Sequence, residues 1–287
     1  MQNNIFLLPL YNDWKSLQKL LKEINNQLKI LREKADIFVV DDNSKNISKI
    51  TIKKFKNIKK LNILKLKKNL GSQKAISIGL RYIHSLKINS IITVMDSDGE
   101  DDSSKIPEMI SSAKRNKDCV VVSCRNKRKE GLIFDVLYKV HKVITCLFAA
   151  RLINFGSYSS FYSQNLKKIL SDNSTWFAYS SALSKNCKLL RLFADRKKRF
   201  YGKSKLSLFG LFLHSLRVNC VFLFRVILIS LTYIFLFYLF KLYFSSHFII
   251  PIILIILFNL LLVAAYLYTE PSKFYKSLIY IKSKTGN

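Results

Sequence analysis

The chain has 287 residues, of which 48 are Lys or Arg and 18 are Asp or Glu, giving a formal net charge of +30. This length allows one large domain or two small ones, and a hydrophobic content of 49% excludes a disordered chain. So large a positive charge indicates an anionic partner, which could be nucleic acid, an anionic membrane face or a phosphorylated substrate.

The first half of the chain alternates short apolar runs with segments of helical periodicity. Strands are predicted at residues 5–10, 37–40, 61–66, 91–95 and 120–122. Helices are predicted to begin at residues 11–13, at 69–75 and at Pro107, the first of them with Asn12 or Asp13 as its N-cap. Strands that alternate with helices predict an α/β fold with a parallel sheet and right-handed crossovers.

The fourth predicted strand runs directly into a cluster of carboxylates, Asp96-Ser-Asp98-Gly-Glu100-Asp-Asp102. Ligands bind at the carboxyl ends of parallel strands, and these carboxylates repel one another unless a cation lies among them. Carboxylate oxygens are preferred ligands of Mg²⁺ and Mn²⁺, which predicts a metal site here. A solvated acidic loop is the alternative. An EF-hand is excluded because Gly99 is fourth in the loop rather than sixth.

Two further features are expected at the same edge of the sheet. The second predicted strand ends in Asp41 and Asp42, and Gly71 lies in a turn at the start of the next helix. Such a turn can present backbone N–H groups to phosphate, although Gly71 could equally be an ordinary turn glycine. A nucleotide with a metal-bound diphosphate would fit this edge.

The middle of the chain is less regular. Residues 132–153 form an apolar helical pattern among basic residues, which predicts either a helix on a membrane surface or a helix packed on the sheet. Around it, the pattern predicts a charged loop at 127–131, strands at 154–163 and 187–193, a loop at 171–185 and a dense basic turn at 196–205.

The last part of the chain predicts a membrane anchor. Residues 206–220 read as an interfacial helix, 221–244 and 248–268 are each long enough to cross a bilayer, and 269–287 is a basic tail. Both flanks of this hairpin are basic and its connecting loop has no Lys or Arg. The positive-inside rule therefore predicts that both termini and the catalytic domain, residues 1–205, are cytoplasmic at the inner membrane.

The sequence also predicts that several features are absent. The five cysteines have no Cys-x-x-Cys spacing and the four histidines have no metal-binding spacing, which predicts reduced thiols and structural histidines. No basic region precedes the apolar stretch at the N-terminus, so a signal peptide is not expected.

Five motifs in chain order resemble the family 2 glycosyltransferases of the GT-A fold. They are Pro9-Leu-Tyr-Asn-Asp13, Val39-Val-Asp41-Asp42-Asn-Ser44, Asn69-Leu-Gly71 with Lys74-Ala75, Met95-Asp96-Ser-Asp98, and Arg199-Phe-Tyr-Gly202-Lys203-Ser204-Lys205. With the membrane hairpin, they more narrowly resemble the polyisoprenyl-phosphate glycosyltransferases, such as dolichol-phosphate mannose synthases and bactoprenol-phosphate glucosyltransferases. The resemblance covers essentially the whole chain and is specific for the family, but not for the sugar.

The resemblance implies a role for each matching residue. The nucleotide pocket would be formed by Pro9, Tyr11, Asp41, Asp42 and Lys74. The metal and the diphosphate would be held by Asp96 and Asp98, with Glu100 assisting. Phosphate groups of the donor or the acceptor would be bound by Arg199, Arg125, Lys203 and Lys205. Asp96, Asp98 and Arg199 would thus carry the catalysis.

One segment departs from the family pattern. The family has an Asp-x-Gly-x-Phe-Arg type segment where this chain has Asn154-Phe-Gly156-Ser157-Tyr158-Ser159, so the acidic and the basic positions are both altered. A sugar hydroxyl needs a general base, whereas a lipid monophosphate, with a second pKa of about 6, is already mostly ionised. The loss of the carboxylate therefore favours a phosphate acceptor.

The resemblance then implies an inverting transfer of a hexose-type sugar from a UDP- or GDP-sugar to a polyprenyl phosphate at the cytoplasmic membrane face, with Mg²⁺ or Mn²⁺. The alternative is a family 2 enzyme that acts on a saccharide or another lipid in cell-envelope glycan synthesis. A nucleic-acid-binding protein is disfavoured, because the acidic strand ends would repel a polyanion. Homo-oligomer formation stays open.

Overall fold

The computed structural model describes residues 3–45, 50, 52, 54–125, 132–202, 208–243 and 248–286. The chain forms two compact units. The first comprises Met1–Arg128, Asn154–Ser204 and Lys273–Asn287, and the second comprises Lys129–Ile153 and Lys205–Ser272.

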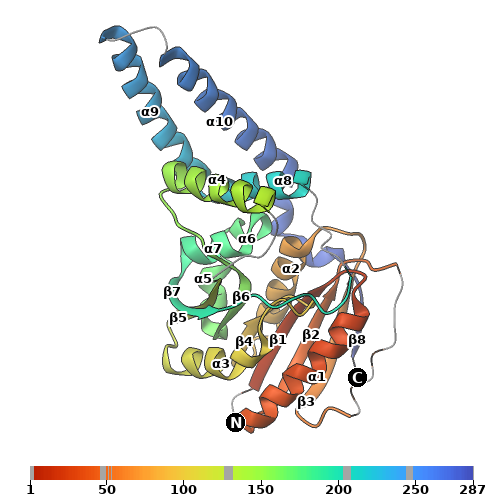
Figure 1. Ribbon diagram of the computed structural model, residues 1–287. Helices are drawn as coiled ribbons and strands as arrows, with labels where there is room; N and C mark the ends of the chain where they lie inside the picture. The colour runs from red at the N-terminus through yellow and green to blue at the C-terminus, as the bar shows by residue number, and fades with distance from the viewer. Residues whose placement is uncertain are drawn as a thin grey trace. The chain divides into compact units, whose positions relative to one another are not determined.

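The first unit is built on an eight-stranded sheet of order β7-β5-β6-β4-β1-β2-β3-β8 (Figure 1). The strands are β1 (Asn3–Leu10), β2 (Ala35–Asp41), β3 (Ile58–Leu66), β4 (Ser90–Val94), β5 (Cys119–Arg125), β6 (Phe155–Tyr162), β7 (Lys188–Ala194) and β8 (Ile281–Gly286). The pairs β1–β2, β2–β3, β1–β4 and β5–β7 are parallel, whereas β6 runs antiparallel to β4 and β5, and β8 antiparallel to β3. The mostly parallel sheet is confirmed.

Helices cover both faces of this sheet. They are α1 (Trp14–Leu31), α2 (Ser72–Ser85), α3 (Ile106–Arg115), α5 (Leu166–Ile169), α6 (Ser174–Phe177) and α7 (Tyr179–Asn186). Short 3₁₀ turns lie at η1 (Ser103–Lys105), η2 (Ser163–Asn165), η4 (Pro271–Phe274) and η5 (Ser277–Tyr280).

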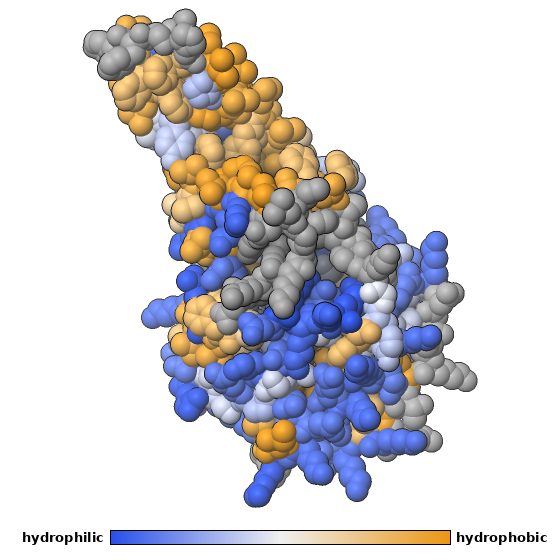
Figure 2. Space-filling model, in the orientation of Figure 1, coloured by the Kyte–Doolittle hydropathy of each residue, from blue (hydrophilic) through white to orange (hydrophobic). Residues whose placement is uncertain are grey.

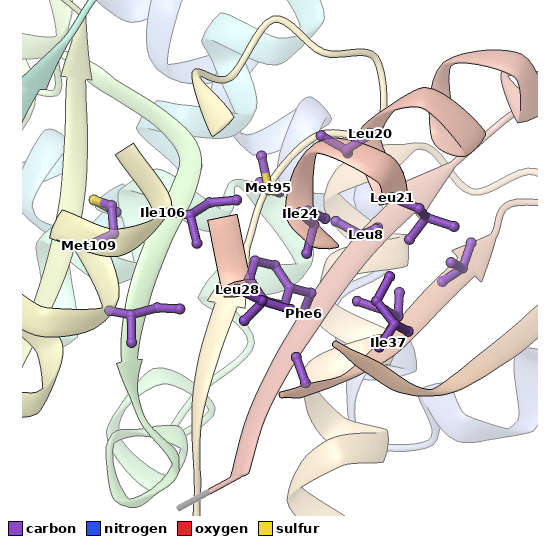
Figure 3. Packing of buried hydrophobic residues seen from close by; sticks show 14 of the residues in the cluster. Phe6, Leu8, Leu20, Leu21, Ile24, Leu28, Ile37, Met95, Ile106 and Met109 are labelled. Atoms are coloured by element: carbon purple, nitrogen blue, oxygen red, sulfur yellow. The ribbon is translucent and has the colours of Figure 1, made fainter. Parts of the chain in front are cut away.

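Side-chain alternation along β1 assigns the helices to opposite faces. Phe6 and Leu8 pack with the apolar stripe of α1 and with Ile106 and Met109 of α3, as Figure 3 shows. Leu7 faces the other way, toward α2. A Cβ at Gly79 would lie 2.5 Å from Leu7 Cδ1, so α2 can approach the sheet this closely only with glycine there. Because both faces are covered, β1 reads as a continuous apolar run.

One secondary-structure prediction for the first unit is wrong. Residues 171–185 were predicted as a loop, but they contain α6 and most of α7, in which Trp176 and Tyr179 are buried. The Asp172 carboxylate accepts a hydrogen bond from the backbone N–H of Ser174 (2.9 Å), at the start of α6. These helices are too short and too rich in Ser and Asn to show helical periodicity.

The division of the chain into units also differs from the predicted domain boundaries. Residues 269–287 were predicted as a separate basic tail, but Lys273–Asn287 belongs to the first unit, where β8 pairs with β3. Residues 129–153, expected within the catalytic domain, belong instead to the second unit. An edge strand with alternating Lys residues carries no local sign of its pairing partner, so the sequence pattern could not reveal it.

The second unit is a group of four helices, α4 (Leu132–Ala149), α8 (Leu208–Cys220), α9 (Leu223–Tyr243) and α10 (Ile249–Thr269). Within it, α4 packs against α8 and α9. The side chains of His141 and Ser215 join α4 to α8 by a 2.7 Å hydrogen bond.

Two helices of this unit are long and apolar enough to cross a membrane, at Leu223–Leu242 and Ile249–Phe274. Only 11% and 17% of their most apolar windows are buried, unlike the core helices of a soluble protein. Figure 2 shows hydrophobic residues over α9 and α10, in contrast to the mainly hydrophilic visible face of the first unit. This composition supports the predicted membrane hairpin.

Candidate active site

The loops that follow β1, β2 and β3 form one half of the candidate site. We call residues 11–13, 42–45 and 67–71 the donor-side loops. The parallel register aligns Leu10 with Asp41 and Asp41 with Lys65, so these loops leave the sheet at the same edge. The backbone N–H of Asp42 donates to the carbonyl of Leu10 (2.8 Å), which continues the pairing into the loops.

Asn12 and Ser44 lock the first two of these loops together. The backbone N–H of Asn12 donates to Ser44 Oγ, and Asn12 Oδ1 accepts from the backbone N–H of Lys45, both at 2.8 Å. Asn12 has a φ of 51°, a left-handed conformation that asparagine tolerates better than most residues. Sequence reasoning treated Asn12 only as a helix cap and missed this link. An asparagine directly after a strand was the available signal.

Asp42 holds the third donor-side loop. Its Oδ1 accepts from the backbone N–H of Leu70 (2.7 Å) and its Oδ2 from that of Gly71 (2.8 Å). Burial raises the pKa of this carboxyl, and the two amide hydrogen bonds oppose that rise. Two of the N–H groups in the turn that was expected to face phosphate, those of Leu70 and Gly71, are therefore occupied by Asp42. Gly71 has a φ of 88°, which explains the glycine.

Asp41 precedes Asp42 in the chain, and only one of its carboxylate oxygens accepts a hydrogen bond from the described residues. Asp41 is only 1% exposed, and its Oδ1 accepts from the backbone N–H of Ser44 (2.9 Å). Its Oδ2 is buried and has no hydrogen-bond partner within the described residues. Buried polar atoms are rarely left unpaired, so this oxygen is a natural acceptor for a ligand N–H or O–H group.

The structure brings the other predicted nucleotide residues to the same region. Pro9 is aligned with Val40, next to Asp41, and Tyr11 follows the end of β1 half-buried. Lys74 lies in the first turn of α2, with its Nζ 4.9 Å from the centroid of the Trp176 ring. Trp176 was not identified from the sequence, because it lies in the segment predicted as a loop.

The other half of the candidate site pairs two segments of opposite charge. We call residues 95–102 the acidic loop and residues 196–200 the basic segment. Arg196 forms an ion pair with Glu100, and Lys197 with Asp102 (2.7 Å). Backbone bonds reinforce the pairing, from Lys197 N–H to the Glu100 carbonyl (2.9 Å) and from Phe200 N–H to the Asp98 carbonyl (3.0 Å).

Gly99 allows the two segments to approach each other. It has a φ of 86°, and a Cβ at this position would collide with the ring of Phe200. The same ring carries Lys19 Nζ 4.3 Å from its centroid, on the side of α1. Phe200 thus fastens the basic segment to the body of the unit, and Gly99 cannot be replaced without moving it.

Arg199 connects the two halves of the site. Its NH1 donates to Asp98 Oδ2 (3.0 Å), its NH2 pairs with Asp13, and its Nε donates to the carbonyl of Tyr201 (3.0 Å). Asp13 does occupy the N-cap position of α1, but its side chain makes no cap hydrogen bond. The predicted N-cap position is therefore confirmed for Asp13, whose side chain bonds to Arg199 rather than to the first turn of the helix.

The carboxylates of the acidic loop differ in their surroundings. Asp96 Oδ1 accepts from Ser157 Oγ (2.9 Å), and its backbone N–H donates to Asp101 Oδ2 (2.9 Å). Burial, and next the charge of Glu100, raise the pKa of Asp98 despite its contacts with the Glu100 amide and Arg199. The ionised form of Asp98 therefore lowers the stability of the folded chain.

The donor atoms here suit a hard divalent cation, but they are not assembled around one. Within the described part of the chain, no three His, Cys, Asp or Glu side chains are grouped to hold a metal ion. Asp96 faces Ser157, Asp98 faces Arg199 and Glu100 pairs with Arg196. The predicted metal set of Asp96, Asp98 and Glu100 is thus not preformed, because basic side chains neutralise two of its members.

The segment that departs from the family pattern lies beside the acidic loop. Through Ser157, β6 contacts Asp96, whereas Asn154 Oδ1 accepts from the thiol of Cys124 (3.4 Å). All five cysteines are free in the structure. Of the predicted phosphate ligands, Lys203 and Lys205 lie outside the described residues. Arg125 ends β5, and its side chain lies outside them too.

Comparisons with known proteins give one family. The model described as glycosyl transferase family 2 matches residues 6–180, well over half of the chain and all of the donor-side loops and the acidic loop.

Two curated relatives have names that refer to lipid phosphates. The chain is 25% identical over 128 residues to dodecaprenyl-phosphate galacturonate synthase of Rhizobium johnstonii, covering 44% of this chain and 37% of the relative. It is 22% identical over 162 residues to undecaprenyl-phosphate 4-deoxy-4-formamido-L-arabinose transferase of Proteus mirabilis, covering 56% and 48%. The matches thus span less than half of either relative.

A solved structure shares the fold at low identity. Glucosyl-3-phosphoglycerate synthase from Mycobacterium tuberculosis, in complex with Mn²⁺ and UDP-glucose, aligns with a TM-score of 0.50 and 12% identity. The alignment covers 78% of this chain and 79% of that one.

Proposed function

Because the chain belongs to glycosyl transferase family 2, with the GT-A fold, we propose that it transfers a hexose-type sugar from a nucleotide-diphosphate sugar to a polyprenyl phosphate. The observation that carries this proposal is the union, in one chain, of a family 2 domain with two exposed apolar helices of membrane-spanning length. A polyprenyl phosphate is confined to the bilayer, so an enzyme anchored there meets it by lateral diffusion. The names of both curated relatives support this acceptor class.

The donor would bind at the donor-side loops. The unpaired Oδ2 of Asp41 would accept a hydrogen bond from the nucleoside, beside Pro9 and Tyr11. Asp42 would act indirectly, since both of its oxygens are used to hold the Leu70–Gly71 turn. Lys74 would lie beside the same pocket, on Trp176.

The chemistry needs no carboxylate base at position 154. A phosphate monoester near neutrality is largely ionised, and its oxygen can attack the anomeric carbon while the nucleotide diphosphate leaves, with inversion. The protein then has to position two anionic groups and neutralise them. A saccharide hydroxyl, the alternative acceptor, would need a base, and Asn154 cannot act as one.

A divalent cation would assist by neutralising the departing diphosphate. Asp96 and Asp98 would hold it, with Glu100 beside them, and their carboxylate oxygens suit either Mg²⁺ or Mn²⁺. The structural relative with Mn²⁺ is consistent with this use of a metal.

Arg199 would bind phosphate groups of the donor or the acceptor. Its guanidinium pairs with Asp13 and Asp98, so a phosphate would compete with these carboxylates for the same planar fork. Lys203 and Lys205, and Arg125, are proposed as further phosphate ligands on the family resemblance alone.

A donor screen tests this function. The full chain, purified in detergent or lipid nanodiscs, would be mixed with undecaprenyl or dolichyl phosphate and each of a panel of UDP- and GDP-sugars, with added Mg²⁺ or Mn²⁺. We expect one donor to give a glycosyl-lipid phosphate and free nucleoside diphosphate. Transfer to a saccharide acceptor but not to the lipid phosphate would contradict the proposal and support the alternative.

We further propose that both termini and the first unit lie on the cytoplasmic side of the cell membrane. The charge pattern around the hairpin supports this orientation. Accessibility tags at the two termini should be reached only from the cytoplasm, and a tag at Ser246, outside the described residues, only from the opposite side. A C-terminal tag exposed outside the cell would contradict the two-span arrangement.

A further inference from the structure

The chain returns to the sheet at the end of its last candidate span, after α10. We call residues 273–286 the C-terminal segment; it follows α10, belongs to the first unit and ends as β8 at the edge of the sheet. The β8 strand pairs antiparallel with Asn62–Leu66 of β3. A stretch that begins just past the membrane hairpin therefore contributes a strand to the domain that carries the donor-side loops.

The start of this segment is anchored on α2. Phe274 is fully buried, and the guanidinium of Arg81 lies 4.7 Å from the centroid of its ring. Arg81 NH2 also donates to the backbone carbonyl of Tyr275 (2.9 Å). Farther along, Lys284 Nζ lies 4.4 Å from the centroid of the Tyr82 ring. The segment is thus fixed at both ends to the helix that begins at the Gly71 turn.

Tyr280 lies between these anchors and contacts the third donor-side loop. Its backbone carbonyl accepts a hydrogen bond from the N–H of Lys67 (2.8 Å), the first residue of that loop. Its ring centroid is 5.7 Å from Lys68 Nζ and 6.2 Å from the centroid of the Trp176 ring. Trp176 in turn carries Lys74, a residue of the predicted nucleotide pocket.

The contacts continue from this loop to the unpaired oxygen of Asp41. Lys67 is held by Tyr280, and Leu70 and Gly71 of the same loop donate to Asp42. Asp42 adjoins Asp41, whose buried Oδ2 lacks a partner within the described residues. Tyr280 therefore restrains one end of a five-residue loop whose other end is bonded to the candidate pocket.

We propose that the C-terminal segment determines the affinity of the nucleotide site, with Tyr280 as the positioning residue that fixes the loop 67–71. This inference rests on the proposed function, because it assumes that a nucleotide binds beside Asp41. It assigns to the residues beyond the membrane hairpin a part in donor binding, in addition to completing the edge of the sheet. The ordering of a loop before binding lowers the entropy lost when the ligand binds.

The test compares three variants of the full chain in nanodiscs. Tyr280→Ala removes the ring between Lys68 and Trp176, and Tyr280→Phe keeps it. Ile279→Ala, in the same 3₁₀ turn, truncates a side chain that is 59% exposed and serves as the matched control. The dissociation constants for UDP and GDP, and the hydrogen exchange of the Lys67, Leu70 and Gly71 amides, are measured for each.

We expect Tyr280→Ala, which loses the ring contacts with Lys68 and Trp176 but keeps the backbone carbonyl, to weaken nucleotide binding about fivefold to tenfold, the scale of one lost aromatic contact, and to speed exchange at the three amides. The donor KM should rise in step while the KM for polyprenyl phosphate stays constant. Tyr280→Phe and Ile279→Ala should behave like the parent chain. A fourth variant, Arg81→Ala, loosens the segment at its anchor on α2 and should also weaken nucleotide binding.

Three results would overturn the inference in distinguishable ways. If the parent chain binds nucleotide and Tyr280→Ala binds it equally well, the coupling is wrong and the segment only completes the sheet. If the parent chain binds neither UDP nor GDP, the proposed function fails, and the role in donor binding fails with it. An equal rise in the KM of donor and acceptor would indicate general loosening and would also count against the inference.

Discussion

The two halves of the candidate site are held by different kinds of interaction. In the donor-side loops, backbone amides donate to the carboxylates of Asp41 and Asp42, which are at most 2% exposed. In the acidic loop, Asp98, Glu100 and Asp102 are paired with side chains of the basic segment, of which Lys197 is 45% exposed, Arg196 20% and Arg199 18%. The donor-side loops are thus held by buried hydrogen bonds to the backbone, whereas the acidic loop is held by ion pairs between side chains.

This difference indicates which half a ligand can rearrange. A hydrogen bond to a buried charge contributes about 1.5–3 kcal/mol and breaks only if the loop unfolds locally. A partly exposed ion pair contributes about 0–1 kcal/mol and can be exchanged for another ion. We therefore expect the nucleoside to enter a rigid pocket, and the phosphates and any metal to displace or recruit the arginines.

The largest effect is expected at the acidic loop. Asp98→Asn removes a carboxylate where a diphosphate or its cation would lie, and should lower glycosyl transfer by more than about 100-fold while the fold is retained. Initial rates and circular dichroism measure the two quantities. Glu108→Gln, which removes an exposed carboxylate from α3, is the control. Full activity of Asp98→Asn, or of the parent chain in excess chelator, would contradict the metal role.

A variant of the donor-side loops should affect binding and stability together. Asp42→Asn replaces one acceptor oxygen by an NH₂ group that cannot accept from the Leu70 or the Gly71 amide. We expect the donor KM to rise about tenfold and the unfolding free energy to fall by about 2 kcal/mol. Asp118→Asn, at an exposed aspartate before β5, should change neither quantity. An unchanged donor KM would contradict the role of the donor-side loops in binding the donor.

Arg199 tests whether the basic segment binds phosphate or only the membrane surface. Arg199→Lys keeps the charge but loses the planar fork, so transfer to polyprenyl phosphate should fall about tenfold or more while membrane association stays constant. Lys197→Ala and Lys198→Ala, in the same segment, should have much smaller effects. Equal effects of all three substitutions would indicate a membrane anchor, in which each charge contributes about 1 kcal/mol additively.

The smallest effect concerns stability against pH, and it has opposite signs at two carboxylates. Burial raises the pKa of Asp98, so its ionised form destabilises the fold, and this cost develops as the pH rises above the ordinary value of 3.8. Asp98→Asn should therefore raise the melting temperature at pH 7 by a few degrees, and the gain should vanish toward pH 4.

Asp102 provides the opposite case. Partial burial raises its pKa, but hydrogen bonds from Lys197 and Ser104 outweigh this and lower the pKa below 3.8. Its ionised form stabilises the fold above pH 3.8, and this contribution is lost as the pH falls through the lowered value. Asp102→Asn should therefore lower the melting temperature at pH 7. Melting curves of both variants between pH 4 and pH 8 that shift in the same direction would contradict the assignment.

Much of this protein follows from its sequence alone. The strand and helix order of residues 3–125, the carboxylates at the ends of β2 and β4 and the two apolar spans are all recorded in local patterns. A strand buried on both faces must be a continuous apolar run, and a span must be about 20 apolar residues long. Such patterns are fixed by the surroundings of each segment and do not require knowledge of its partners.

Only the tertiary structure decided how these segments are joined. The ion pairs of Arg199 with Asp13 and Asp98 span 186 and 101 positions, and the pairing of β8 with β3 brings residues after the hairpin to the edge of the sheet. No hydropathy pattern records such partners, because a basic run reads the same beside a lipid, a phosphate or an acidic loop. The use of Asp42 to hold the Gly71 turn likewise appears only once the chain is folded, as does the lack of a partner for Asp41 Oδ2 among the described residues.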